Sequence, residues 1–179
     1  SLPERTYYQK PEVIKDFRAL ATKFFKTVGA PDAEKRAKNV VDFEVAFSKT
    51  YPLPQEFRDL YNKKTEISRD ELNAEYPSLK LADTLASVPG GVLIRHMTPQ
   101  NYAFLESAFK TYDLRTLKDL YVFHELTSFM DDAFPEFFKV SFEFNRKHLG
   151  GPNKRPDRQE RCTEKIKQNF AMEIDAELV

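Results

Sequence analysis

The chain has 179 residues, of which 41% are hydrophobic and only five are glycine; this composition is typical of an ordered globular protein or of a piece of a larger one. Lys plus Arg and Asp plus Glu both number 28, so the basic surplus that is typical of nucleic-acid-binding proteins is lacking. No apolar stretch approaches the roughly 20 residues that cross a bilayer, and the first residues lack the apolar core of a signal peptide, so we expect neither nucleic acid nor membrane among the partners of this segment.

The first predicted elements are two helices that pack as an antiparallel pair. Apolar residues recur every three to four positions from Pro11 to Val28, which predicts an amphipathic helix with one buried face. Gly29 is suited to the left-handed position that ends such a helix. A second helix is predicted to open at Pro31, and the connection of two to three residues favours antiparallel packing.

Prolines and a capping pattern divide the middle of the chain into short elements. Pro52 and Pro54 precede a short turn of helix, and Ser68 with Glu71 has the spacing of a capping box, so one or two helical turns are predicted to follow. Residues 79–88 are predicted to form another short helix. The β-branched run at 92–97 is the one good strand candidate.

The last third of the chain is predicted to be helical. Thr98-Pro99 and Asp113 are expected to begin two helices, and Pro135 a third that is rich in phenylalanine and ends at Gly150-Gly151. A final helix is predicted from about Arg158 to the end of the chain. We therefore expect a mainly all-α fold over residues 1–179, a single multi-helix array of antiparallel helices with at most one short strand or hairpin.

The most tempting catalytic pattern begins at His124. A helix with the sequence H-E-x-x-H places two imidazoles one turn apart for Zn²⁺ and a glutamate beside the bound water. Here His124-Glu125 is followed by Ser128 at the second histidine position, and neither His96 nor His148 has ligand spacing to His124. We interpret His124 as a histidine on a partly buried helix face, and predict no metal ligand.

Cys162 is the only cysteine, so it excludes an internal disulfide and any multi-cysteine zinc site. A nucleophilic role would need a nearby histidine and a setting that lowers the thiol pKa, so a core or disulfide-partner role is favoured. Gly90-Gly91 and Gly150-Gly151 match turns and helix ends rather than phosphate-binding loops. The sequence thus predicts no catalytic residue and no metal-binding residue within this segment.

Six short segments, none of them strongly specific alone, match one known family in collinear order. The segments are Leu2–Tyr8 (L-P-x-R-x-Y-Y), Asp42–Ala46, Arg58–Lys63 with its L-Y-N-K, Val92–Tyr102, Tyr112–Lys118 and Arg161-Cys162. Together they resemble the neprilysin and endothelin-converting-enzyme family of zinc metallopeptidases, in the helical region that precedes the catalytic domain. The resemblance spans almost the whole chain.

The resemblance implies a function that depends on residues outside this chain. Family members bind Zn²⁺ through H-E-x-x-H and a downstream glutamate in a C-terminal catalytic domain, and they cleave short peptides on the amino side of hydrophobic residues. The helical region closes over that site and admits peptides while excluding folded proteins. By this resemblance the partners are the catalytic domain of the same polypeptide and short peptide substrates, and the parent protein lies outside the cell or on its surface.

The resemblance also assigns a role to Cys162, because the cysteine at this position pairs in secreted members with one upstream of this segment. Without that partner we expect a free thiol. Because the chain begins with Ser1 rather than methionine, we expect a processed or excised piece. The resemblance implies that the catalytic domain follows residue 179. The main hypothesis is a substrate-gating lid; the alternatives are a stand-alone helical interaction module and a hydrolase that uses Cys162 or His124.

Overall fold

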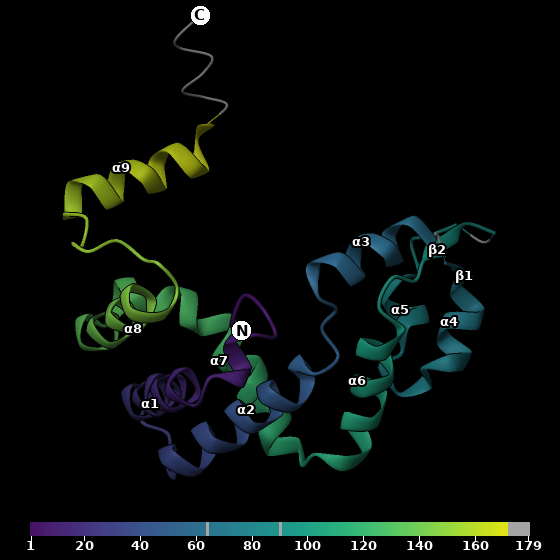
Figure 1. Cartoon of the computed structure of the whole chain (residues 1–179), viewed down its shortest axis with the longest axis horizontal. Coiled ribbons are helices and arrows are strands. Elements are labelled where there is room, and N and C mark those ends of the chain that lie inside the picture. Colours follow the sequence, from purple (N-terminus) through teal and green to yellow (C-terminus); the bar gives the residue numbers. More distant parts are fainter. Residues whose placement is uncertain (64, 90, 172–179) are drawn as a thin grey trace, which may run out of the picture. The chain divides into compact units, whose positions relative to one another are not determined.

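A computed structural model describes residues 1–63, 65–89 and 91–171, and Figure 1 shows that it consists mainly of helices. The chain divides into two compact units, residues 1–141 and a C-terminal unit that starts at Phe142, and each is described by itself.

The elements in chain order are η1 (Tyr7–Gln9), α1 (Pro11–Thr27), α2 (Ala33–Ser48), α3 (Pro54–Lys63), β1 (Glu66–Ser68), α4 (Arg69–Glu75), η2 (Pro77–Leu79), α5 (Leu81–Thr84), β2 (Leu93–Arg95), α6 (Pro99–Thr111), α7 (Leu114–Ala133), α8 (Pro135–His148) and α9 (Arg158–Asn169). The predicted all-α class is confirmed, whereas a single region over residues 1–179 stays a prediction.

Helices α1 and α2 form the predicted antiparallel pair. Lys26, at the end of α1, contacts Glu34 at the start of α2 at 2.5 Å. Arg18, farther back in α1, contacts Asp42 farther along α2 at 2.9 Å, so the two chain directions oppose each other. The predicted boundary is correct at Gly29, whose φ of +69° follows the end of α1.

The start of α2 differs from the prediction by two residues. Pro31 lies in a turn, and α2 begins at Ala33. Asp32, the residue before the helix, has a left-handed backbone with φ of 54°, which aspartate tolerates better than most residues. A proline can therefore precede the helix in the turn, rather than occupy its first position.

The core of the first unit is built on the apolar stripe of α1. Six residues of this helix are buried, and Phe24 and Phe25 are completely inaccessible. The ring of Phe24 meets Phe123 of α7 edge to face at 5.1 Å and Phe137 of α8 at 6.1 Å, a geometry that aromatic pairs prefer. The predicted amphipathic face of α1 is thus the face that joins three other helices.

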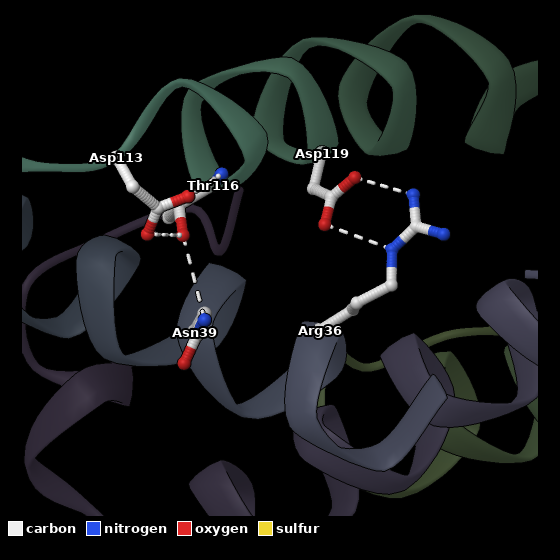
Figure 2. A network of polar contacts seen from close by, with 5 residues as sticks. All are labelled: Arg36, Asn39, Asp113, Thr116 and Asp119. Carbon is white, nitrogen blue, oxygen red and sulfur yellow. Dashed lines mark hydrogen bonds and ion pairs between the residues drawn. The ribbon is translucent and has the colours of Figure 1, made fainter. Parts of the chain in front are cut away.

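A polar network fixes α2 against α7 (Figure 2). The guanidinium of Arg36 donates to both carboxylate oxygens of Asp119, with 2.8 Å from Nε to Oδ2; the side chain of Asp119 is only 4% exposed. One turn along α2, Asn39 donates to Thr116 at 3.4 Å. Asp113, the predicted N-cap of α7, accepts from the backbone N–H of Thr116 at 2.9 Å. The network sets the rotation of α7 about its axis.

The middle of the chain forms a two-stranded antiparallel sheet flanked by short helices. Ile67 of β1 is paired with Ile94 of β2, so the strand predicted at 92–97 is confirmed in shorter form and its partner is β1. Ser68 ends β1 and also forms, with Glu71, the predicted capping box of α4. The helix predicted at 79–88 is reduced to η2 and the four residues of α5, with Lys80 between them in a left-handed conformation.

The C-terminal unit contains the end of α8 and helix α9. Gly150, with φ of +68°, follows α8 as predicted. Asp157 and Glu160 form a capping box at the start of α9, and the rest of the predicted final helix, including Ile174 and Leu178, lies outside the described residues. Among the helices described, none is both long and apolar enough to span a bilayer.

Candidate functional site

A groove of about 770 Å³ lies in the first unit, where α2, α6 and α7 meet. Its walls are mostly apolar and include residues from all three helices: Phe43, Phe47, Leu105, Phe109, Leu114 and Tyr121. A volume of this size falls within the range of roughly 300–1,000 Å³ that is typical of ligand-binding clefts. The groove is therefore our candidate site.

The sequence forms the groove through the sharp connection between α6 and α7. Only Tyr112 and Asp113 separate the two helices, and Asp113 caps α7 as soon as the chain turns. The ring of Phe43 lies 4.9 Å from that of Tyr112 and 5.4 Å from that of Phe104. These ring contacts hold the connection and α6 against α2.

One end of the groove is polar, and its central group is the carboxylate of Glu44, which is 2% exposed. Tyr8 donates its hydroxyl to Oε2, while Oε1 contacts His124 Nε2 at 2.5 Å and accepts from the Ser1 hydroxyl at 3.3 Å. Leu2 in turn donates its backbone N–H to the Tyr8 hydroxyl at 2.8 Å. The carboxylate thus connects the segment before α1, helix α2 and helix α7.

The surroundings of Glu44 favour its ionised form. Burial opposes ionisation, but hydrogen bonds, that from His124 first, hold the pKa of the Glu44 carboxyl below its usual value. Burial, and then the charge of Glu44, raises the pKa of the Tyr8 hydroxyl, so Tyr8 stays a donor at neutral pH. Since protein groups already use both oxygens of Glu44, this cluster is suited to hold elements together rather than to attack a substrate.

The open rim of the groove is apolar and accessible. Phe109 is 56% exposed, Leu114 66% and Tyr121 69%. Leu114, Lys118 and Tyr121 follow one another at helical spacing on α7, so they lie on one face. Lys118 lines the same groove, and among the residues that the structure describes it has no hydrogen-bond or ion-pair partner.

The residues singled out from the sequence do not meet at one place. His124 lies at the polar end of the groove, with a side chain 36% exposed. His96 is buried beside Tyr76 and Tyr102, and Cys162 is exposed on α9. Within residues 1–63, 65–89 and 91–171, no three His, Cys, Asp or Glu side chains gather in a way that could hold a metal ion.

Sequence reasoning missed the role of Glu44. The signal was present, because a single acidic residue interrupts the apolar face that Val40, Val41 and Phe43 form on α2. A carboxylate on such a face must find buried donors. Its partners could not have been named in advance, since Tyr8 and His124 are 36 and 80 positions away in the sequence.

Comparison with family models matches residues 1–179, the whole chain, to the model described as Peptidase family M13. No curated protein and no solved structure gives a match. The family match covers every segment on which the resemblance in the sequence rested.

Proposed function

Because this chain belongs to peptidase family M13, in the region N-terminal to the catalytic part, we propose that it is the helical lid of a zinc metallopeptidase that cleaves short peptides. In this proposal the lid supplies no catalytic group. It limits the size of the substrates that reach the active site and excludes water from it, as closing elements do in many enzymes. The parent protein acts outside the cell or on its surface.

The observation that carries the proposal is the apolar, accessible rim of the groove in a chain of this family. Three large apolar residues, Phe109, Leu114 and Tyr121, are each more than half exposed around one cavity. Contiguous apolar surface of this kind marks a place where a protein meets a ligand or another protein. The catalytic region of the same polypeptide and its peptide substrates are the proposed partners.

Zinc belongs, in this proposal, to the catalytic region. The described residues of this chain do not fit a zinc site, since the only candidate pattern has one histidine and its Nε2 is bound to Glu44. When bound in the catalytic region, the metal would polarise the peptide carbonyl and the attacking water. The residues of this chain position elements and exclude water; we assign them no step of the chemistry.

The test compares peptides of increasing length, and a small folded protein, as substrates of the intact peptidase. We expect that Leu114→Glu combined with Tyr121→Glu, which places charge on the rim, changes the ratio of cleavage of long to short peptides at unchanged zinc content. Phe129→Glu is the control, because Phe129 is as exposed as Tyr121 on the same helix but does not line the groove. An unchanged length preference in the double variant would contradict the lid.

A stand-alone interaction module is the alternative that the same exposed groove favours. The two functions differ in the part of the gene that lies downstream of this segment. A reading frame that continues into H-E-x-x-H supports the lid, and a transcript that ends at Val179 supports the module. A hydrolase within this chain would instead show peptide cleavage by the 179-residue protein that His124→Ala or Cys162→Ala removes.

A further inference from the structure

We infer that one face of helix α9 binds a linear sulfated polysaccharide. This basic face consists of Arg158, Arg161 and Lys165, and Lys154 lies just before it in the connection between α8 and α9. The inference goes beyond the proposed function, because it concerns a different surface and a different ligand. It rests on that proposal in one respect: the location of the parent protein outside the cell decides between several polyanions.

The three cations share a face of α9 because their spacing follows the helix. Arg158, Arg161 and Lys165 occupy positions i, i+3 and i+7, and residues three or four apart are neighbours on a helix surface. With a rise of about 1.5 Å per residue, the basic face extends over about 10 Å of helix. Like charges at this spacing repel one another, and a polyanion that lies along the helix relieves the repulsion.

The basic groups are accessible to a ligand. Lys154, Arg158 and Lys165 are exposed, and within the part of the chain that the structure describes their side chains form no ion pair or hydrogen bond. Arg161 is partly buried and donates from Nη1 to the backbone oxygen of Pro156 at 3.1 Å. That acceptor carries no full charge, so the guanidinium of Arg161 stays positive beside the other two cations.

The acidic residues of α9 point away from the basic face. Glu160 forms the capping box with Asp157, and Glu164 contacts Lys167 at 3.3 Å. At about 100° per residue, Glu160 and Glu164 lie roughly 90–130° around the helix from the middle of the basic face. The face that remains for a ligand is therefore positive.

The attraction for an anion is local to this part of the chain. Residues 142–171 contain eight Lys or Arg and four Asp or Glu, whereas the whole chain has no net charge. Residues 172–179, which lie outside the described range, add three acidic residues. Because charges act over about 10 Å at 0.1 M salt, a ligand beside α9 responds mainly to the cations of that helix rather than to the neutral total.

The location and the composition of α9 decide which polyanion fits. Anionic lipids belong to the cytoplasmic leaflet and nucleic acids to the inside of the cell, so a protein outside the cell meets sulfated polysaccharides instead. Helices that lie on membranes also carry a broad apolar face that enters the lipid. In α9 the only large apolar residue is Ile166, which is too little for such a face.

The experiment measures binding of a fluorescein-labelled heparin hexasaccharide to the 179-residue chain by fluorescence anisotropy. Unlabelled heparin, desulfated heparin, a DNA duplex and phosphatidylserine vesicles are compared as competitors at equal concentration of negative charge. We expect heparin to compete most strongly. The affinity should fall as salt rises, because binding releases counterions from the polyanion.

A matched pair of variants locates the site. Lys165→Gln should weaken binding about fivefold at low salt, the effect of one exposed ion pair, and should reduce the salt dependence by about one contact. Lys167→Gln removes the same charge from another face of α9, where Lys167 contacts Glu164, and should change binding less than about twofold. Arg158→Gln combined with Lys165→Gln should weaken binding about 25-fold, since the two sites are far enough apart to act independently.

Several results would overturn the inference. They are no binding of the hexasaccharide, equal losses in Lys165→Gln and Lys167→Gln, an affinity that does not depend on salt, and stronger competition by desulfated heparin, DNA or vesicles than by heparin. Circular dichroism of each variant checks that the helices remain.

The lid is tested separately by the length preference of the intact peptidase, which Arg158→Gln with Lys165→Gln should leave unchanged. If heparin does not bind but the preference changes with the rim of the groove, only the inference is wrong. If heparin binds through α9 but the rim leaves the preference unchanged, only the lid is wrong.

Discussion

Helices α1 and α9 both carry an apolar stripe at helical spacing, and the two stripes have opposite surroundings. In α1 the stripe is buried against α2, α7 and α8, and Phe24 and Phe25 have no accessible surface. In α9 no described residue is buried; Ile166 is 54% exposed, and Phe170, directly after the helix, is 53% exposed. A periodic apolar face shows that a helix needs a partner, but it does not show where that partner lies.

The largest expected loss of stability comes from a substitution in the buried apolar stripe of α1. Phe24→Ala removes a ring that contacts Phe25, Phe123 and Phe137, and we expect a loss of about 3–5 kcal/mol in the free energy of unfolding from the cavity and the lost burial. Urea denaturation followed by circular dichroism measures it. Phe170→Ala, directly after α9, is the matched control, with an expected change within about 0.5 kcal/mol. Similar losses in both variants would mean that the stripe of α9 is buried as well.

The second prediction tests whether the buried ion pair between Arg36 and Asp119, and not apolar packing alone, holds α2 against α7. Asp119→Ala leaves the guanidinium of Arg36 without its two acceptors in a largely buried place, so we expect a loss of about 2–3 kcal/mol. Asp42→Ala removes an exposed pair with Arg18 and should cost less than about 1 kcal/mol. Urea midpoints of the two variants, measured at one salt concentration, check the order; equal losses would contradict it.

The third effect concerns the carboxylate that joins the first residues to α2 and α7. Glu44→Gln should lower the free energy of unfolding by about 1.5–3 kcal/mol at pH 7, because the bonds from Tyr8 and His124 lose a charged acceptor. The folded-state pKa of Glu44 lies below its ordinary value of 4.5. The stability that the ionised form contributes is therefore present above pH 4.5 and is lost as pH falls through the folded-state pKa.

The control for that prediction is the free energy of unfolding of the wild-type protein and of Glu44→Gln, measured over a series of pH values. The difference between the wild-type protein and Glu44→Gln should decrease as the pH falls below 4.5. A difference that stays the same down to the lowest pH at which the protein is folded would show that Glu44 is not ionised in the folded state.

The smallest effect on stability is expected at Cys162 on α9. Its thiol is exposed, so a maleimide should label it in the native protein at a rate close to that in denatured protein, and Cys162→Ser should change the free energy of unfolding by less than about 0.5 kcal/mol. Mass spectrometry counts the added label. Native protection of the thiol would show that α9 is covered in solution, and absence of a free thiol after denaturation would contradict an unpaired cysteine.

Much of the local structure could be predicted from the sequence because it depends on neighbours along the chain. The capping box at Ser68 and Glu71, the cap at Asp113 and the helix end at Gly29 all depend on backbone groups within three or four positions. The start of α2 and the length of the helix predicted at 79–88 were wrong, because left-handed residues at Asp32 and Lys80 introduce turns that no pattern indicates.

The candidate site could not be predicted from the sequence, because it depends on contacts between distant residues. The chain by itself determined a mainly helical fold, the faces of its helices and, through six collinear segments, its peptidase family. Only the tertiary structure placed Glu44 against Tyr8 and His124 and left Phe109, Leu114 and Tyr121 exposed around one groove. Periodicity fixes which residues share a face of a helix, whereas the packing of helices decides which face is covered.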